Sequence, residues 1–267
     1  MEKQIIWRGL LAGAVAGVLS FVFARVFLES VIGRAVDYEG GRSDAEAALA
    51  VHEAAHEHGA HGHGVELFTR GVQANIGMGF GVLAFSVAMG ALFAVAFAVV
   101  YARSRTTQVR GLALIMAASA FVVVYLVPFL KYPANPPSVG EPDTIGQRTG
   151  LYLLMVVLSL AFAAGAVWLA RAAEPRLGTW NAALCGLGAY VVAVGVAMLV
   201  LPGISETPGP LTDDAGGMVF PGFSADDLFE FRLYAVGTQL VIWLTIGLFG
   251  GALLDRLLNS ERERIAA

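Results

Sequence analysis

The stretch IIWRGLLAGAVAGVLSFVFARVFL, residues 5–28, decides the fold class of this chain. Only Arg8 and Arg25 interrupt it with charge, and a helix of this length crosses the roughly 30 Å of hydrocarbon in a membrane. The apolar run is longer than the about 7–15 residues of a secretory signal core, and no small-residue cleavage site follows it. We therefore expect an uncleaved first membrane span.

Further apolar stretches of similar length follow along the chain, at roughly 76–101, 110–129, 151–170, 181–201 and 233–254. Because lipid offers no partner to backbone N–H and C=O groups, each stretch is predicted to be a helix. The chain is 57% hydrophobic and 14% charged, against about 25% charged residues in soluble domains. These features predict an all-α membrane protein, in which one domain over residues 1–267 is a bundle of six transmembrane helices.

Charged residues outside the predicted spans are distributed unequally between the two sides of the membrane. The side with both termini carries ten Lys and Arg residues and five acidic ones, whereas the other side carries six and sixteen. Because Lys and Arg favour the cytoplasmic side, we predict cytoplasmic N- and C-termini, with the segments 29–75, 130–150 and 202–232 outside. A net charge of −4 and the lack of a basic run argue against nucleic acid as a partner.

Two weaker patterns concern how the helices associate. Arg-Gly-Leu opens the first and third spans, at 8–10 and 110–112, which favours three helical hairpins repeated in parallel, although arginine at a membrane edge is also ordinary anchoring. Glycines spaced by four, at Gly9, Gly13 and Gly17, indicate close helix packing in a bundle or in a homo-oligomer. The same spacing recurs in two later spans, at Gly77 and Gly81 and at Gly247 and Gly251.

All five histidines of the chain fall in one stretch of the first outer segment, HEAAHEHGAHGH at 52–63. Ser43-Asp44-Ala45-Glu46 is a capping-box pattern, so we expect a short helix that begins there and ends at Gly59. Imidazole and carboxylate groups are usual ligands of zinc, nickel and cobalt, so this extracytoplasmic histidine-rich loop is predicted to capture a divalent ion. The alternative is a polar insertion without metal. The predicted ligands are His52, His56, His58, His61, His63, Glu53 and Glu57.

The first five residues of this stretch, His52-Glu53-Ala54-Ala55-His56, also match the zinc-protease pattern H-E-x-x-H. In that pattern two histidines hold zinc and the glutamate is the general base. A membrane-embedded protease needs this helix inside the membrane, whereas here it is polar and predicted to lie outside. We therefore predict no catalytic residues, no enzyme activity and no permanently bound cofactor.

Other candidate residues lie in the second outer segment and at the ends of the spans. The proline-rich stretch 128–137 frees backbone carbonyls, and such irregular backbone is tolerated near membrane depth where it lines a cavity or is buried in protein. The alternative is a rigid outer turn with an ion pair. Polar residues within spans are functional candidates by default. The residues predicted to line the transport path or its entrance are Lys131, Tyr132, Asn135, Asp143, Arg148, Arg232, Gln239 and Asn75.

The third outer segment is acidic and rich in Gly and Pro. Its carboxylates, Glu206 among them, would either concentrate cations or belong to an ordinary solvated loop. Ser224-Ala225-Asp226-Asp227 predicts the cap of a helix that leads into the last span.

Three parts of the sequence resemble the CbtA family of predicted cobalt transporter subunits, and the resemblance covers essentially the whole chain. They are FLKYPANPP at 129–137, PDTIGQRT at 142–149, and FRL at 231–233 with GTQL at 237–240. The resemblance implies cobalt uptake through a prokaryotic cytoplasmic membrane to supply cobalamin synthesis. It also implies a small single-span partner subunit, CbtB, which bears histidines of its own.

Residues and resemblance together predict a multi-pass, lipid-embedded protein that takes up a divalent metal, with Co²⁺ first and Ni²⁺ or Zn²⁺ behind it. The outer histidines would capture the ion before it reaches the helices. Two alternatives remain open. One is a non-transporting metal-binding or sensing scaffold subunit whose partner forms the pore, and the other is the H-E-x-x-H membrane zinc protease.

Overall fold

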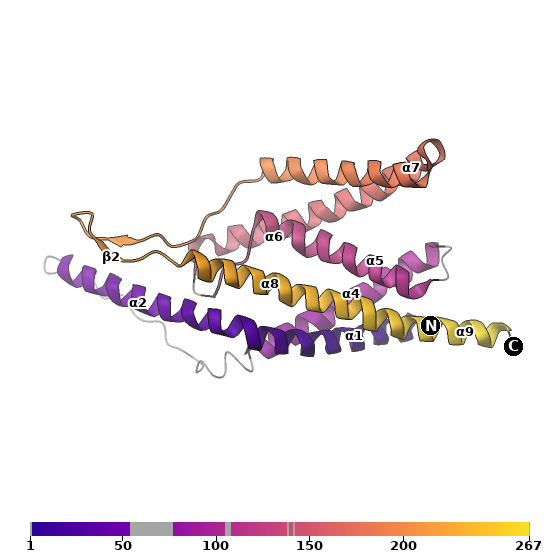
Figure 1. The fold of residues 1–267 in the computed structure, drawn as a ribbon, viewed down its shortest axis with the longest axis horizontal. Helices are drawn as coiled ribbons and strands as arrows, with labels where there is room; N and C mark the ends of the chain where they lie inside the picture. Colours follow the sequence, from indigo (N-terminus) through magenta and orange to yellow (C-terminus); the bar gives the residue numbers. More distant parts are fainter. Residues whose placement is uncertain (1, 54–76, 105–107, 138, 141, 267) are drawn as a thin grey trace. The chain divides into compact units, whose positions relative to one another are not determined.

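A computed structural model describes residues 2–53, 77–104, 108–137, 139–140 and 142–266 of the chain. Within these residues, five helices are long and apolar enough to cross a membrane. This observation agrees with the predicted all-helical membrane fold (Figure 1).

The chain divides into two compact units, which are described separately. Unit 1 comprises Met1–Ala118, Asn135–Gly140 and Thr207–Ala267, and unit 2 comprises Ser119–Ala134 and Glu141–Glu206.

The first helix of unit 1 is much longer than its predicted span. α1 (Glu2–Phe23), the π-helical turn η1 (Ala24–Leu28) and α2 (Glu29–Glu53) follow one another without a break. The prediction of a separate short helix capped by Ser43 is therefore wrong, because Ser43 lies inside α2. The glycine pair that precedes it in the sequence could have ended a helix, but both glycines are helical here.

Glycines on α1 allow α4 (Met78–Arg103) to approach it closely. A Cβ atom on Gly13 would lie 2.8 Å from the Cα atom of Val87, and a Cβ atom on Gly90 would lie 2.8 Å from the Cα atom of Gly13. Both separations are shorter than van der Waals contact, so the crossing accepts only glycine at these positions. The predicted packing role of the first glycine series is confirmed. Gly81 has no such role among the described residues, because a Cβ atom there would meet nothing within 4 Å.

Two further long helices also pass through a π-helical turn. They comprise α5 (Val109–Ala120), η3 (Phe121–Leu126) and α6 (Val127–Lys131), and α8 (Ala225–Thr245), η5 (Ile246–Gly250) and α9 (Gly251–Ala266). A Cβ atom on Gly247 would lie 2.9 Å from Ala117 Cβ, and one on Gly251 would lie 3.0 Å from Ala113 Cβ. The predicted packing role of Gly247 and Gly251 is therefore also confirmed, because they allow η5 and α9 to approach α5 closely.

The longest helix of unit 2, α7 (Ile145–Val200), is interrupted at Gly178. This residue has φ 74° and ψ 163°, a conformation that favours glycine, and it follows Pro175 closely. Figure 1 shows the ribbon of α7 doubling back at this point. The hydroxyl oxygens of Ser159 and Tyr190 lie 2.8 Å apart, so the two halves of α7 pack against each other in antiparallel fashion.

The interruption explains why five long helices stand where six spans were predicted. The predicted spans 151–170 and 181–201 both lie in α7, one on each side of the kink. The number of membrane crossings and the side on which the termini lie stay predictions.

Parts of all three predicted outer segments pack together in unit 1. We call this part the hairpin subdomain; it consists of α2, residues 139–140, the hairpin of β1 (Leu211–Thr212) with β2 (Met218–Phe220), and the stretch from there through the first turns of α8. Its core is formed by Ala35, Val139, Phe223 and Leu228, with Tyr38 packed against it. The prediction of a cap at Ser224 is confirmed, since its hydroxyl accepts a hydrogen bond from the Asp227 backbone N–H at 3.3 Å.

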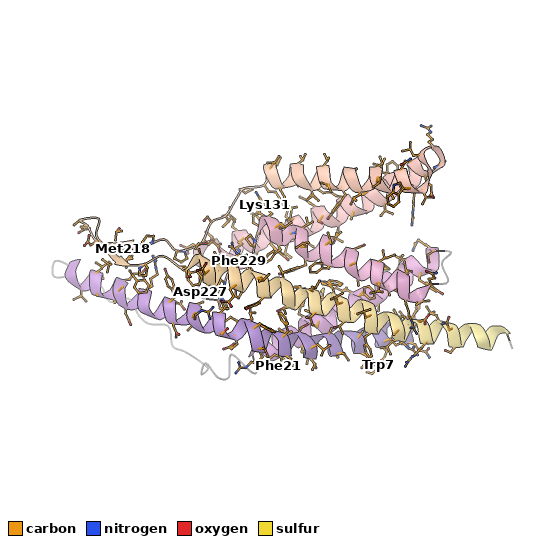
Figure 2. The ribbon with its side chains drawn as sticks, in the orientation of Figure 1. Trp7, Phe21, Lys131, Met218, Asp227 and Phe229 are labelled. Atoms are coloured by element: carbon orange, nitrogen blue, oxygen red, sulfur yellow. The ribbon has the colours of Figure 1, made fainter. Side chains whose placement is uncertain are left out.

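Polar contacts fasten α2 to the rest of the hairpin subdomain. Arg34 Nε donates to Asp227 Oδ1 at 2.7 Å, and the same guanidinium also pairs with Glu230; Asp227 lies on the side of α8 that faces α2 (Figure 2). The hydrogen bond with Asp227 raises the pKa of Arg34 above its ordinary value. Arg42 donates to the Gly209 carbonyl at 2.7 Å. These contacts hold α2 along the beginning of α8.

Candidate functional site

The predicted histidine ligands fall almost entirely outside the described residues. His52 and Glu53 form the end of α2, and the remaining ligands lie between 54 and 76, where the structure describes nothing. Among the described residues, no group of three or more His, Cys, Asp or Glu side chains is placed to hold a metal ion. The metal-capture site therefore stays a prediction.

The proline-rich stretch of unit 2 is held in place by two of the predicted path residues. Lys131 Nζ donates to the Met198 carbonyl at 2.7 Å, and Tyr132 Oη donates to the Pro202 carbonyl at 2.8 Å. Met198 belongs to the last turn of α7, whose carbonyls have no partner within the helix, so the ammonium group satisfies one of them. Lys131 thus caps a helix.

A buried ion pair ties the start of α7 to the segment that follows its end. Arg148 donates to Glu206 at 2.6 Å and to the Pro133 carbonyl at 2.7 Å, while Thr144 donates to the other Glu206 oxygen at 2.6 Å. The Glu206 side chain is only 2% exposed. Neither interpretation left open for these carboxylates fits Glu206, because a buried, paired carboxylate neither concentrates cations at the surface nor belongs to a solvated loop. The alternative of a rigid turn with an ion pair agrees with the Arg148–Glu206 contact.

The other predicted path residues are dispersed. Arg232 donates to Asn135 Oδ1 at 3.0 Å within unit 1, whereas Asp143 is exposed in unit 2. Gln239 Oε1 and, one turn further along α8, Trp243 Nε1 are buried and have no hydrogen-bond partner among the described residues. Asn75 lies outside the described residues. The structure thus joins Lys131, Tyr132 and Arg148 in unit 2 but does not gather the whole predicted set.

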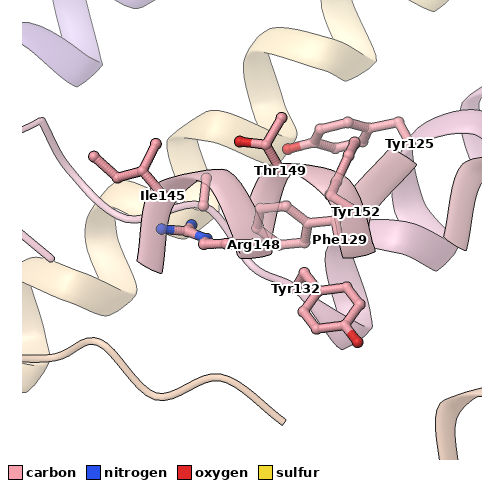
Figure 3. Close-up of a pocket in the computed structure, with 8 residues that line it drawn as sticks. Tyr125, Phe129, Tyr132, Ile145, Arg148, Thr149 and Tyr152 are labelled. Atoms are coloured by element: carbon pink, nitrogen blue, oxygen red, sulfur yellow. The ribbon is translucent and has the colours of Figure 1, made fainter. Parts of the chain in front are cut away.

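A cavity in unit 2 has a volume of about 300 Å³ (Figure 3). It lies between the end of the η3–α6 helix and the first turns of α7. Its lining residues are Tyr125, Phe129, Tyr132, Ala134, Ile145, Arg148, Thr149 and Tyr152.

Comparison with known proteins identifies the chain from its sequence as a whole. A family model described as "probable cobalt transporter subunit (CbtA)" matches residues 2–255. The chain belongs to the CbtA family. No curated protein and no solved structure is significantly similar to it. The CbtA match confirms the resemblance inferred from the proline-rich and neighbouring stretches, and gives the chain a role in cobalt transport as one subunit of a transporter.

Sequence reasoning missed several residues that organise this CbtA chain. Glu206 is the counter-charge of Arg148, and Asp227 with Glu230 is the counter-charge of Arg34. An arginine near a membrane edge needs a carboxylate partner, and this need is the signal that the sequence offers. It could not select one carboxylate, because the third outer segment offers six.

Proposed function

We propose that this chain is the multi-pass subunit through which Co²⁺ enters a prokaryotic cell across the cytoplasmic membrane. The observation that carries the proposal is the family match, which extends over residues 2–255 and therefore includes four of the five long apolar helices of the described residues and most of the fifth. The word subunit implies a partner, and a small single-span, histidine-bearing subunit of the CbtB type is the partner proposed here.

Six membrane crossings with cytoplasmic termini suit the helices best. The two parts of α7, 145–177 and 179–200, are each long enough at 1.5 Å per residue to cross about 30 Å of hydrocarbon. Counting them separately gives an even number of crossings. The excess of Lys and Arg on the side of the termini supports a cytoplasmic location for both ends.

The histidines at 52–63 are proposed to collect the ion outside the cell. Neutral imidazole nitrogen suits Co²⁺, Ni²⁺ and Zn²⁺, so the metal preference comes from the family rather than from the ligands. Gln239 is proposed to offer its amide oxygen on the path, because that oxygen is buried and lacks a partner among the described residues. Lys131, Arg148 and Glu206 are proposed to support the bundle rather than contact the ion.

The experiment that tests this function measures cobalt influx into sealed vesicles that contain the purified chain with its partner subunit. A cobalt-quenched dye inside the vesicles reports the rate at low external Co²⁺. We expect influx with the intact chain and slower influx when all five histidines are changed to Ala. The matched control is Glu39→Gln, an exposed residue of α2. Equal rates for the intact and histidine-free chains would remove the capture role.

Vesicles with this chain alone distinguish the transporter from the scaffold alternative. A chain that transports admits Co²⁺ without its partner, whereas a scaffold subunit admits none until the partner is added. The zinc-protease alternative predicts instead that Glu53→Gln abolishes a cleavage activity while metal still binds. The family description is that of a transporter subunit, which favours the non-enzymatic function.

A further inference from the structure

The cavity of unit 2 is built mainly by the two stretches that carry the family resemblance. Six of its eight lining residues belong to 129–137 or 142–149. The same stretches are braced by the Arg148–Glu206 ion pair and by the Tyr132–Pro202 hydrogen bond. Two polar contacts therefore hold the segments that line the cavity.

The chemistry of the walls excludes a metal ion and disfavours an anion. The lining contains no imidazole, thiol or carboxylate, which are the side chains that bind divalent transition metals. Its one formal charge belongs to Arg148, which already pairs with Glu206 and donates to the Pro133 carbonyl. Four of the eight lining residues are aromatic. The ligand that such walls accept is uncharged and apolar.

The location of the cavity indicates which apolar ligand reaches it. It lies where two long apolar helices end and begin, and its tyrosines correspond to the aromatic belt of a membrane interface. Ile145 at its rim is 60% exposed, and the same helix continues with Leu153 and Val157, 57% and 61% exposed. In a bilayer this surface is covered by lipid, so the methylenes near the ester end of an acyl chain are the apolar groups nearest to the cavity.

We propose that the cavity of unit 2 binds one acyl chain of a membrane lipid. The acyl chain lies against the rings of Tyr125, Phe129 and Tyr152. The Thr149 hydroxyl is close to the polar ester groups of the lipid. The bound chain fills the space behind the proline-rich stretch and keeps its walls apart. This inference is independent of the transported ion.

The test uses the full-length chain in vesicles of phosphatidylethanolamine and phosphatidylglycerol that contain a phospholipid with a photoactivatable diazirine in the ester-proximal half of one acyl chain. After illumination, mass spectrometry locates the labelled residues. We expect labelling to concentrate on Tyr125, Phe129 and Tyr152 relative to the exposed face of α7. Thr149→Trp, which fills the cavity from an exposed position, should lose this concentrated labelling.

Val157→Trp is the matched control, because it adds the same side chain to an exposed position of the same helix outside the cavity. It should retain the wild-type labelling pattern. Ile145→Asp is a second variant that puts a charge at the rim without adding volume, and it should also lose the labelling. The proposal is overturned if Thr149→Trp and Ile145→Asp label like the wild type. It is equally overturned if addition of the partner subunit removes the labelling, since the cavity then accepts a partner side chain instead.

Discussion

Gly90→Ala should weaken the crossing of α1 and α4. The new Cβ atom would lie 2.8 Å from the N and Cα atoms of Gly13. Carbon atoms pack at about 3.5–4.0 Å, so the two helices must separate by roughly 0.7 Å or more. Overpacking of this kind costs about 1–3 kcal/mol, and the better helix propensity of Ala offsets about 0.5–1 kcal/mol of it. The midpoints of these ranges give a net loss of about 1 kcal/mol in the free energy of unfolding.

Gly81→Ala is the matched control in the same helix. A Cβ atom there meets nothing within 4 Å, so only the propensity gain remains. This variant should be as stable as the wild type or more stable by up to about 1 kcal/mol. The two variants differ only in the position of one methyl group, and their unfolding free energies should therefore change in opposite directions.

The assay is equilibrium unfolding in mixed micelles, in which the sodium dodecyl sulfate fraction is raised and helix loss is followed by circular dichroism. The linear dependence of the unfolding free energy on denaturant fraction gives the difference between variants. If Gly90→Ala and Gly81→Ala were equally stable, α1 and α4 would not cross at Gly13 and Gly90, and the packing argument would be refuted.

Three further predictions test other parts of the chain. Glu206→Gln leaves Arg148 buried without its counter-charge and should cost about 3–5 kcal/mol of unfolding free energy, whereas the exposed Asp143→Asn should change it by less than about 0.5 kcal/mol. Arg34→Gln removes a half-exposed ion pair and should cost at most about 1 kcal/mol in the same assay; a larger loss would mean that the pair is desolvated in the membrane-bound protein. Cobalt capture by the five histidines should weaken as the pH falls through about 6.5, because only neutral imidazole binds metal; calorimetric titration at about pH 7.5 and 5.5 that gives equal affinities would contradict the capture role.

The positions of the membrane helices could be predicted because hydrophobic length is a local property. The spans at 76–101 and 110–129 differ from α4 and the α5–η3–α6 helix by two residues or fewer at each end. The turn between the predicted fourth and fifth spans was also visible, since Pro175 and Gly178 fall in the short charged stretch between them. Each of these signals lies within a few residues of the feature that it predicts.

Contacts between distant segments could not be predicted in the same way. Nothing in the polarity of 29–53 indicates that it continues the first helix and packs against a hairpin almost two hundred residues later. Glu206 looked like one acid among six, and only its position in space makes it the partner of Arg148. Lys131 was expected near an ion path, yet the carbonyl that it caps belongs to a helix end identified only by the fold. Such roles depend on which segments meet.

The length of α2 changes how captured cobalt would reach the membrane helices. Its 25 residues extend about 37 Å at 1.5 Å per residue, so under the proposed topology His52 stands far from the first span. The next helix nevertheless begins beside α1, because a Cβ atom on Gly79 would lie 3.2 Å from the Phe21 ring. Under the proposed capture role, an ion bound at His52 must therefore still cover the length of α2 before it reaches the membrane end of α1, where α4 begins.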